Sequence, residues 1–176
     1  MEYSELIMQR RSIRKYKEEP VDHDTLVSIL KKAQLAPSWK NQQTSRCYVV
    51  ESKEEIEELR REALPSFNQN NSAGAALIVT TYVRNIVGYT DGKPVNELGN
   101  RWGIYDLGLH DAYLILAAAD AGLDTLIMGI RDAEAIRRVL SIPEEEDVVS
   151  VIAIGKRDQE PGTPKRKELN EVVKFL

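Results

Sequence analysis

The feature that most constrains the fold is an apolar helical stretch between Ile104 and Ala121. Leucine, isoleucine and alanine occupy most of its positions, so little polar surface is left on any side. A helix that is apolar on most sides must be buried inside the protein. Gly122 follows directly and is suited to end the helix in a left-handed conformation. The stretch therefore predicts a long interior helix on which the other elements pack.

Four segments enriched in β-branched or aromatic residues predict strands around this helix. The expected strands are 46–50, 75–83, 126–128 and 148–154. The segment 75–83 is typical of a strand covered on both faces, because it is apolar along nearly its whole length. The expected helices are 2–10 with Leu6 and Ile7 inward, one capped by Asp22 or Asp24 that ends near Ala36, 53–63, and one capped by Asp132 that ends at Leu140. This order predicts a layered α/β or α+β protein with the sheet against the central helix.

Length and charge exclude several classes of protein. At 176 residues, the chain fits one domain, or one domain with arms. The net charge of -4 argues against a general nucleic-acid binder, which usually carries a basic face. Cys47 is the single cysteine, which excludes an internal disulfide and fits a reducing compartment. No apolar run has the length of a membrane span and no signal peptide is recognisable, so we expect a cytoplasmic protein that binds neither membrane nor nucleic acid.

A basic segment stands out against this acidic background. The eight residues from Arg10 to Lys17 carry five positive charges and no negative charge. Such a density is unfavourable by self-repulsion unless an anion binds nearby. In an extended segment, Arg10, Ser12 and Arg14 would face one point while Ile13 turns into the protein. Guanidinium groups and a hydroxyl suit a phosphate, and a solvated basic turn is the competing interpretation.

Other motifs that carry chemistry are missing. There is no Gly-x-Gly-x-x-Gly after a strand, no P-loop, no His-Glu-x-x-His and no cysteine pair, so we expect no metal site. His110 and Asp111 point about 100° apart on a helix, and no serine or cysteine is placed to complete a triad. We interpret His110 as a core or interface histidine. What remains is an anion-binding pattern in three places, the basic segment, the polar loop 37–45 and the triplet Lys165-Arg166-Lys167.

Several short motifs follow one another over essentially the whole chain. They are Arg10-Arg11-Ser12-Ile13-Arg14-x-Tyr16, Ala36-Pro37-Ser38, Asn41-x-Gln43, Asp106-Leu107-Gly108, Gly122-Leu123, Ile127-Met128-Gly129, Ile142-Pro143-Glu144, Gly155 and Arg166-Lys167-x-Leu169-x-Glu171-Val172-Val173. Each motif is weak alone, but the ordered set resembles the nitroreductase family of FMN-dependent flavoproteins. Thr44-Ser45 departs from the Pro-Trp of many members. The resemblance implies an α+β fold in which a mixed sheet packs on a buried central helix, and an intertwined homodimer.

The resemblance also implies an FMN site at the dimer interface, built by both chains. The implied cofactor-binding residues are Arg10, Arg11, Ser12, Arg14, Pro37, Ser38, Trp39, Asn41, Gln43, Ile127, Met128, Gly129, Lys165 and Arg166. The first four would hold the phosphate, with Arg11 the weaker member, and the triplet around Arg166 would close on it. The loop residues would come from the second chain, and Asn41 and Gln43 have donors and acceptors for a pyrimidine edge. Residues 127–129 would lie beside the isoalloxazine.

The resemblance further implies one domain over residues 1–176, a lid loop at 84–103 and a C-terminal arm at 156–176 that reaches the partner protomer. NADH or NADPH would deliver hydride to the flavin, and a small electron-poor acceptor such as a nitroaromatic or a quinone would then take its place in a ping-pong sequence. It implies no protein acid or base. Two alternatives stay open: a flavin enzyme of the same fold with other chemistry, such as dehalogenation or flavin fragmentation, and a non-catalytic module that binds an anion or an acidic partner.

Overall fold

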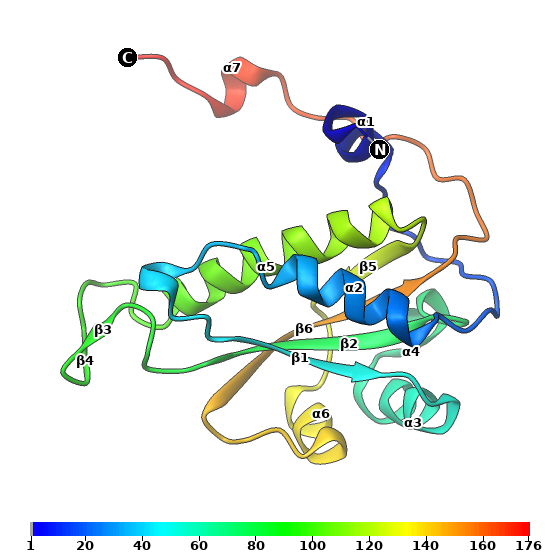
Figure 1. The fold of residues 1–176 in the computed structure, drawn as a ribbon, viewed down its shortest axis with the longest axis horizontal. Coiled ribbons are helices and arrows are strands. Elements are labelled where there is room, and N and C mark those ends of the chain that lie inside the picture. The colour runs from blue at the N-terminus through cyan, green and yellow to red at the C-terminus, as the bar shows by residue number, and fades with distance from the viewer. Residues whose placement is uncertain (1) are drawn as a thin grey trace.

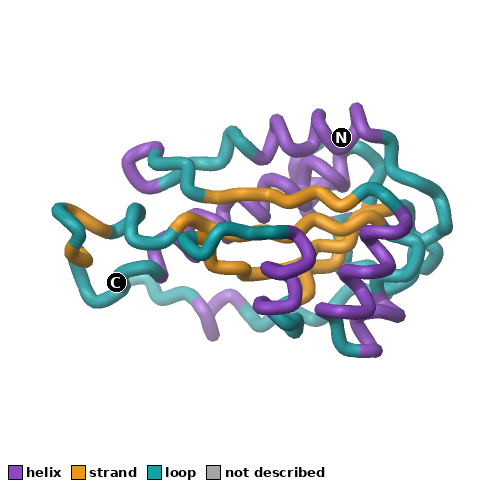
Figure 2. The backbone as a smooth tube through the Cα atoms, turned by 90° about the horizontal axis from the view of Figure 1, so that it is seen from below, coloured by secondary structure: helices purple, strands orange, loops and turns teal. Residues whose placement is uncertain are grey.

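The computed structural model describes residues 2–176, so Met1 of the expected domain lies outside the described residues. A four-stranded sheet with helices on both faces forms the body of the molecule (Figure 1). Its strands are β1 (Ser45–Val50), β2 (Ala76–Val83), β5 (Asp124–Met128) and β6 (Glu146–Gly155). The helices are α1 (Tyr3–Gln9), α2 (His23–Ala33), α3 (Lys53–Ala63), α4 (Ser66–Asn71), α5 (Arg101–Asp120), α6 (Ala133–Leu140) and α7 (Leu169–Val172). Figure 2 shows a hairpin of β3 (Tyr89–Thr90) and β4 (Lys93–Pro94) projecting from one end.

The strand order in the main sheet is β1-β2-β6-β5, and each neighbouring pair is antiparallel. The sheet is mixed because Ser12 forms a parallel bridge with Thr125. At this bridge the Ile13 N–H donates to the Thr125 carbonyl at 3.0 Å. This bridge places the basic segment along the outer edge of β5. No strand among residues 2–176 pairs with the outer edge of β1.

Each face of the sheet has its own apolar core, because side chains alternate along the strands. Leu77 and Val79 of β2 pack toward the face that α3 and α6 cover. Ile78, between them in sequence, packs toward α2 and α5 on the other face. β2 is buried on both faces, as its apolar sequence predicts. The fold is therefore the expected α+β arrangement, with the sheet against the long helix α5.

Several of the predicted element boundaries are confirmed. Helix α3 covers the predicted residues 53–63. The side chain of Asp22 accepts the Thr25 N–H at the start of α2, and Asp132 accepts two N–H groups at the start of α6. Gly122 follows α5 with a φ of 76°, the left-handed conformation predicted for it. These local signals suffice because each cap acts within three residues of its own position.

Other boundaries differ from the predictions. Helix α2 ends at Ala33 rather than near Ala36, because the N–H groups of Leu35 and Ala36 turn to carbonyls three residues back ahead of the proline. Helix α5 begins at Arg101, three residues earlier than its apolar residues indicate. The short helix α4 and the β3–β4 hairpin were not predicted, since neither has an apolar repeat.

The outer side of α5 carries apolar side chains that the single protomer leaves open. Ile104, Tyr105 and Tyr113 are exposed, and the opposite side, with Leu107 and Leu114, is fully buried. Apolar on both sides, α5 thus has a second face that still lacks a packing partner within the described chain. Among residues 2–176, no helix is both long and apolar enough to cross a membrane.

Both ends of the chain lie outside this body. Helix α1 buries no residue, and the prediction that Ile7 faces inward is wrong, because its side chain is exposed. In Figure 1 the C-terminal segment runs from β6 past α1 and then away from the sheet, so that α7 stands free. The apolar side chains of this tail, including Val172 and Phe175, are exposed.

Candidate functional site

The basic segment is held in place by its apolar residues. Ile13 is 0% exposed, as the alternation of side chains predicts. Tyr16 is buried, and its hydroxyl donates to the Ile13 carbonyl at 3.0 Å. The backbone of Lys17 then passes so close to Gly74 that a Cβ there would lie 3.0 Å from the Lys17 oxygen. Gly74 also has a φ of 81°, so this crossing requires glycine. These contacts leave Ser12 and Arg14 facing outward.

Three guanidinium groups gather at the start of this segment. Burial lowers the pKa of Arg10, and the positive charges of Arg11 and Arg166 lower it further. Arg11 donates to the Thr163 hydroxyl at 2.6 Å, which ties the C-terminal segment to the basic segment. The structure thus brings Arg166 near Arg10 although they are 156 positions apart. The ion pairs of residues 2–176 include no carboxylate for Arg10, whereas Lys15 pairs with Asp158 at 2.9 Å. A half-buried cation with positive neighbours and no anion is suited to bind one.

Residues 127–129 follow directly along the strand that Ser12 joins. Ile127 is 47% exposed, and a Cβ built on Gly129 would meet no atom within 4 Å. Met128 is 2% exposed and lies in the core between the sheet and α6, so its side chain points away from solvent. This segment can therefore present one apolar side chain and open backbone beside the basic segment. The Met128 side chain is not part of that surface.

The polar loop 37–45 has an unusual backbone. Lys40, Asn41 and Gln43 all have positive φ values, between 48° and 56°. Non-glycine residues adopt this conformation rarely, and a cluster of three needs support from its surroundings. The Ser38 hydroxyl accepts the Gln43 N–H at 3.1 Å, and the buried carboxylate of Asp106 on α5 accepts the Trp39 N–H at 2.8 Å. Asn41 and Gln43 remain exposed.

The two groups of predicted site residues lie at opposite ends of α5 within one protomer. Asp106, near the start of α5, contacts the polar loop, whereas Ala119 near its end lines a cavity with Arg10. Thirteen residues of helix between them correspond to about 20 Å. The structure therefore brings Arg10, Ser12, Ile127 and Arg166 into one region. It does not bring the loop 37–45 to them in the same chain.

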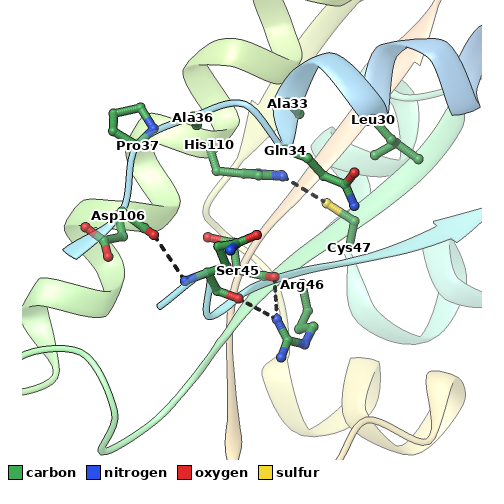
Figure 3. Close-up of a pocket in the computed structure, with 12 residues that line it drawn as sticks. Leu30, Ala33, Gln34, Ala36, Pro37, Ser45, Arg46, Cys47, Asp106 and His110 are labelled. Atoms are coloured by element: carbon green, nitrogen blue, oxygen red, sulfur yellow. Dashed lines mark hydrogen bonds between the residues drawn. The ribbon is translucent and has the colours of Figure 1, made fainter. Parts of the chain in front are cut away.

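A cavity of about 370 Å³ lies between the polar loop, α2, β1 and α5. Figure 3 shows His110 pointing across this cavity toward Cys47, with the two atoms Nε2 and Sγ 4.0 Å apart. The other ring nitrogen, Nδ1, lies 3.3 Å from the Asp111 carboxylate. That carboxylate also accepts the Thr80 hydroxyl at 3.1 Å. Sequence reasoning placed no serine or cysteine to complete a triad with His110, and it did not anticipate that the strand β1 brings Cys47 beside the ring from 63 residues away.

This arrangement does not make Cys47 a nucleophile. Burial, with a smaller contribution from the Asp111 charge, raises the pKa of the Cys47 thiol to about 12. The thiol therefore stays protonated at neutral pH, and the thiol form reacts poorly. The chain Cys47–His110–Asp111–Thr80 instead satisfies polar groups near the sheet.

Aromatic residues join the expected lid to the polar loop. The rings of Trp39 and Trp102 lie 4.9 Å apart, and Tyr105 meets Trp102 edge-on at 5.7 Å. The Trp102 ring N–H donates to Asn96 at 3.0 Å, and it packs on Gly88, where a Cβ would lie 2.7 Å from the ring. Sequence reasoning missed Asp106, Trp102 and Tyr105 as contributors to this region. The available signal for Asp106 was a carboxylate near the start of an otherwise apolar helix.

The remaining residues add no second candidate centre. Among residues 2–176, no group of three or more His, Cys, Asp or Glu side chains could hold a metal ion. Glu146 is buried in another part of the sheet, where it accepts hydrogen bonds from Tyr48 and Thr81. The Asp124 carboxylate is neutralised by Arg157 at 2.6 Å.

Comparison with known proteins identifies the family to which this chain belongs. The model of the nitroreductase family matches residues 7–156. A protein of Methanothermobacter thermautotrophicus named "Putative NADH dehydrogenase/NAD(P)H nitroreductase" is 30% identical over 167 residues, which cover 93% of this chain and 81% of that protein. The structure of an FMN-dependent nitroreductase of Clostridium difficile R20291 is similar with a TM-score of 0.76 and 28% identity, over 97% of this chain and 96% of that one. A structure from Exiguobacterium sibiricum 255-15 in complex with FMN has a TM-score of 0.86 at 23% identity, over 100% and 98% of the two chains, and this likeness shows the fold alone.

Proposed function

Because this chain belongs to the nitroreductase family, it is an FMN-dependent NAD(P)H oxidoreductase, and we propose that two copies of the chain build each flavin site. The observation that carries this proposal is the separation of the two halves of the site along α5. Each half is accessible in the protomer, and neither is complete without the other. A second copy that packs on the open side of α5 can supply the missing half.

The residues present fit a phosphorylated flavin. Arg10 is half-buried without a carboxylate partner among the described residues, Arg11 and Arg166 add positive charge beside it, and Arg14 is exposed further along the same segment. A phosphate dianion bound there would relieve the repulsion between these cations and form charge-assisted hydrogen bonds. Ser12 offers a hydroxyl on the same outward side, and residues 127–129 offer open backbone next to it. Arg11 is engaged with Thr163, which supports its assignment as the weaker member.

The second copy would contribute the polar loop. Pro37, Ser38, Trp39 and Asn41 would pack along the flavin, and the exposed amides of Asn41 and Gln43 would meet its pyrimidine edge. The left-handed backbone presents these side chains on the outside of the molecule. FMN, when bound, supplies the redox chemistry between NAD(P)H and an electron-poor acceptor such as a nitroaromatic or a quinone. The chain supplies binding and orientation, and no acid or base is required of it.

Exposed apolar surface supports the homodimer and the C-terminal arm. Ile104, Tyr105 and Tyr113 of α5 form one open patch, and the tail 169–176 carries another. A tail without a core of its own is stable when it docks on another chain. The uncovered edge of β1 is a surface to which an extended segment can add. We propose that 156–176 is this arm and that residues 84–103 act as a lid over the site.

The same observations bear on where the protein is located in the cell and on the alternative functions. We propose a cytoplasmic enzyme, which the single unpaired cysteine supports. The non-catalytic binding module is set aside, because the family match spans most of the chain. Dehalogenation and flavin fragmentation have no specific observation in their favour.

Absorbance of the purified protein and anaerobic titration with NADH and NADPH test the proposed activity. We expect a yellow dimer that either nicotinamide bleaches and an acceptor reoxidises, with ping-pong kinetics. Arg14→Glu is expected to lose FMN, because a carboxylate would repel the phosphate. Arg138→Glu, on α6 where the side chain lies 3.7 Å from Glu62, is the matched control and is expected to keep it. Full FMN occupancy in Arg14→Glu would contradict the phosphate assignment.

A mixed dimer tests whether both copies build one site. Arg14→Glu and Asn41→Glu are each expected to empty both sites of a homodimer. When the two variants are co-expressed with different tags, the mixed dimer has both defects in one site and none in the other. We therefore expect about one FMN per mixed dimer and none in either parent. A mixed dimer without FMN would show that both residues act on the same site of one chain.

A further inference from the structure

The polar loop 37–45 needs an external support. Three of its residues hold left-handed backbone, which is unfavourable for side chains other than glycine. Inside the loop, the Ser38 hydroxyl accepts the Gln43 N–H, and Gln43 contacts the Asn41 carbonyl at 3.4 Å. These bonds close the loop on itself but do not fix where it lies. The bond that fixes its place must reach another element.

The end of the loop is held by β2, where the Val83 N–H donates to the Thr44 carbonyl at 3.1 Å, and the centre of the loop is held by Asp106 on α5. Its Oδ2 accepts the Trp39 N–H at 2.8 Å, across 67 positions of sequence. Trp39 lies between Ser38 and Asn41, so the bond acts at the centre of the segment expected to meet the flavin. The Trp39 ring also contacts Trp102, but a ring contact allows sliding that a hydrogen bond to a rigid helix does not.

The burial of Asp106 is unfavourable for stability. The side chain is 4% exposed, and the ion pairs of the described chain include none for it. Burial raises its pKa, and the Trp39 N–H opposes that rise by stabilising the charged form. His110 lies one turn further along α5, and Arg46 and Cys47 of β1 line the same cavity, yet no hydrogen bond from these three groups reaches the carboxylate. A residue that weakens the fold while it holds a functional loop has a role beyond packing.

Resting on the proposed function, we infer that Asp106 is the positioning residue of the flavin site, holding the loop 37–45 of one chain in the shape that receives the flavin of the partner. It acts through Trp39 and touches neither cofactor nor acceptor. Its oxygen orients the loop backbone, and the loop then presents Ser38 and Asn41. Loss of that oxygen leaves the left-handed residues without their bond to α5, and the loop relaxes.

Two substitutions separate positioning from packing. Asp106→Asn keeps an oxygen that accepts the Trp39 N–H, whereas Asp106→Leu fills a similar space without an acceptor. The first readout is hydrogen exchange of the Trp39 amide in the full-length FMN-free dimer. We expect exchange about tenfold or more faster in Asp106→Leu, and close to the unsubstituted rate in Asp106→Asn. Asp24→Asn, in the exposed first turn of α2, is the control.

The second readout is FMN affinity set against thermal stability. We expect Asp106→Leu to bind FMN about tenfold or more weakly while its melting temperature is unchanged or higher, because a buried charge has been removed. Asp106→Asn is expected to restore affinity. A residue with only a packing role would move affinity and stability in the same direction.

Unchanged Trp39 exchange in Asp106→Leu would overturn the inference, as would equal FMN affinity in the Leu and Asn variants. If Asp106→Leu melts far below the unsubstituted protein, the exchange and affinity of Asp106→Asn decide alone, and a loss in Asp106→Asn overturns the inference. The exchange measurement needs no flavin. A protein that protects the Trp39 amide through Asp106 but never binds FMN would contradict the proposed function and leave the anchor in place.

Discussion

The basic segment 10–17 and the polar loop 37–45 are both expected to bind the flavin, yet they are fixed to the rest of the protein in different ways. The basic segment is pinned by apolar burial, with Ile13 and Tyr16 driven into the core and the charges left outside. The polar loop has no such side chain at its centre, and the bond that ties this centre to a helix goes to one oxygen of Asp106. Apolar anchors serve stability and position together. A polar anchor serves position at the expense of stability, so substitutions in the two regions should separate these effects.

The largest effect is expected from the apolar anchor. Ile13→Ala removes a fully buried side chain and should lower the free energy of unfolding by about 2–4 kcal/mol. Urea unfolding of the FMN-free protein measures it, and Leu35→Ala, an exposed residue beyond α2, is the control. A loss below about 1 kcal/mol would mean that burial does not pin the basic segment.

The second largest effect is expected at Arg10, a charged residue of the segment that Ile13 anchors. Arg10→Glu should weaken FMN binding by about a hundredfold, since it replaces an attraction to phosphate with a repulsion. Stability of the FMN-free protein should stay the same or rise, because Arg10 no longer opposes Arg11 and Arg166. Fluorescence titration with FMN and thermal melting measure the two quantities. A loss of both together would indicate that Arg10 is structural.

A smaller effect, dependent on pH, is expected at the polar anchor. The pKa of Asp106 is raised in the fold above its ordinary 3.8, so the fold binds this proton more tightly than the unfolded chain does. The contribution of the protonated group is complete below the ordinary pKa and is lost as pH rises through the raised one. Asp106→Asn should therefore raise the melting temperature at pH 7 and raise it less near pH 4. A gain that is the same at both pH values would refute the assignment of the effect to ionisation.

The smallest effect is expected at the end of the polar loop. The Thr44 hydroxyl is buried and finds no hydrogen-bond partner among the described residues. Thr44→Val keeps the shape and removes the unsatisfied group, so the protein should gain about 0.5–1 kcal/mol. Ser45→Ala, at the less buried neighbouring position, is the comparison. Urea unfolding decides it, and a loss of stability would reveal a partner for this hydroxyl.

The basic segment and the polar loop also differ in how well the sequence predicts them. The inward turn of Ile13, the caps of α2 and α6, and the doubly covered strand β2 were all predictable, because alternation and capping act within a few residues. The loop was predictable only as a polar segment. None of its left-handed residues is a glycine, so the sequence does not indicate this conformation. Its anchor, Asp106, lies 67 positions away from Trp39.

Long-range contacts between polar groups were the main source of error. The approach of Cys47 to His110 was missed because it depends on how α5 lies across β1, which periodicity does not encode. The approach of Arg166 to Arg10 was expected only through the resemblance to a family, and composition alone left the basic triplet as one of three separate patches.

The contact between Trp39 and Trp102 gives the protein its own optical probe. These are the only two tryptophans in the chain, and both belong to the wall that joins the polar loop to the expected lid. Ultraviolet emission therefore arises almost entirely from this one spot. Energy transfer from the indoles to a nearby flavin would darken that emission, so the filling of the site can be followed without any label.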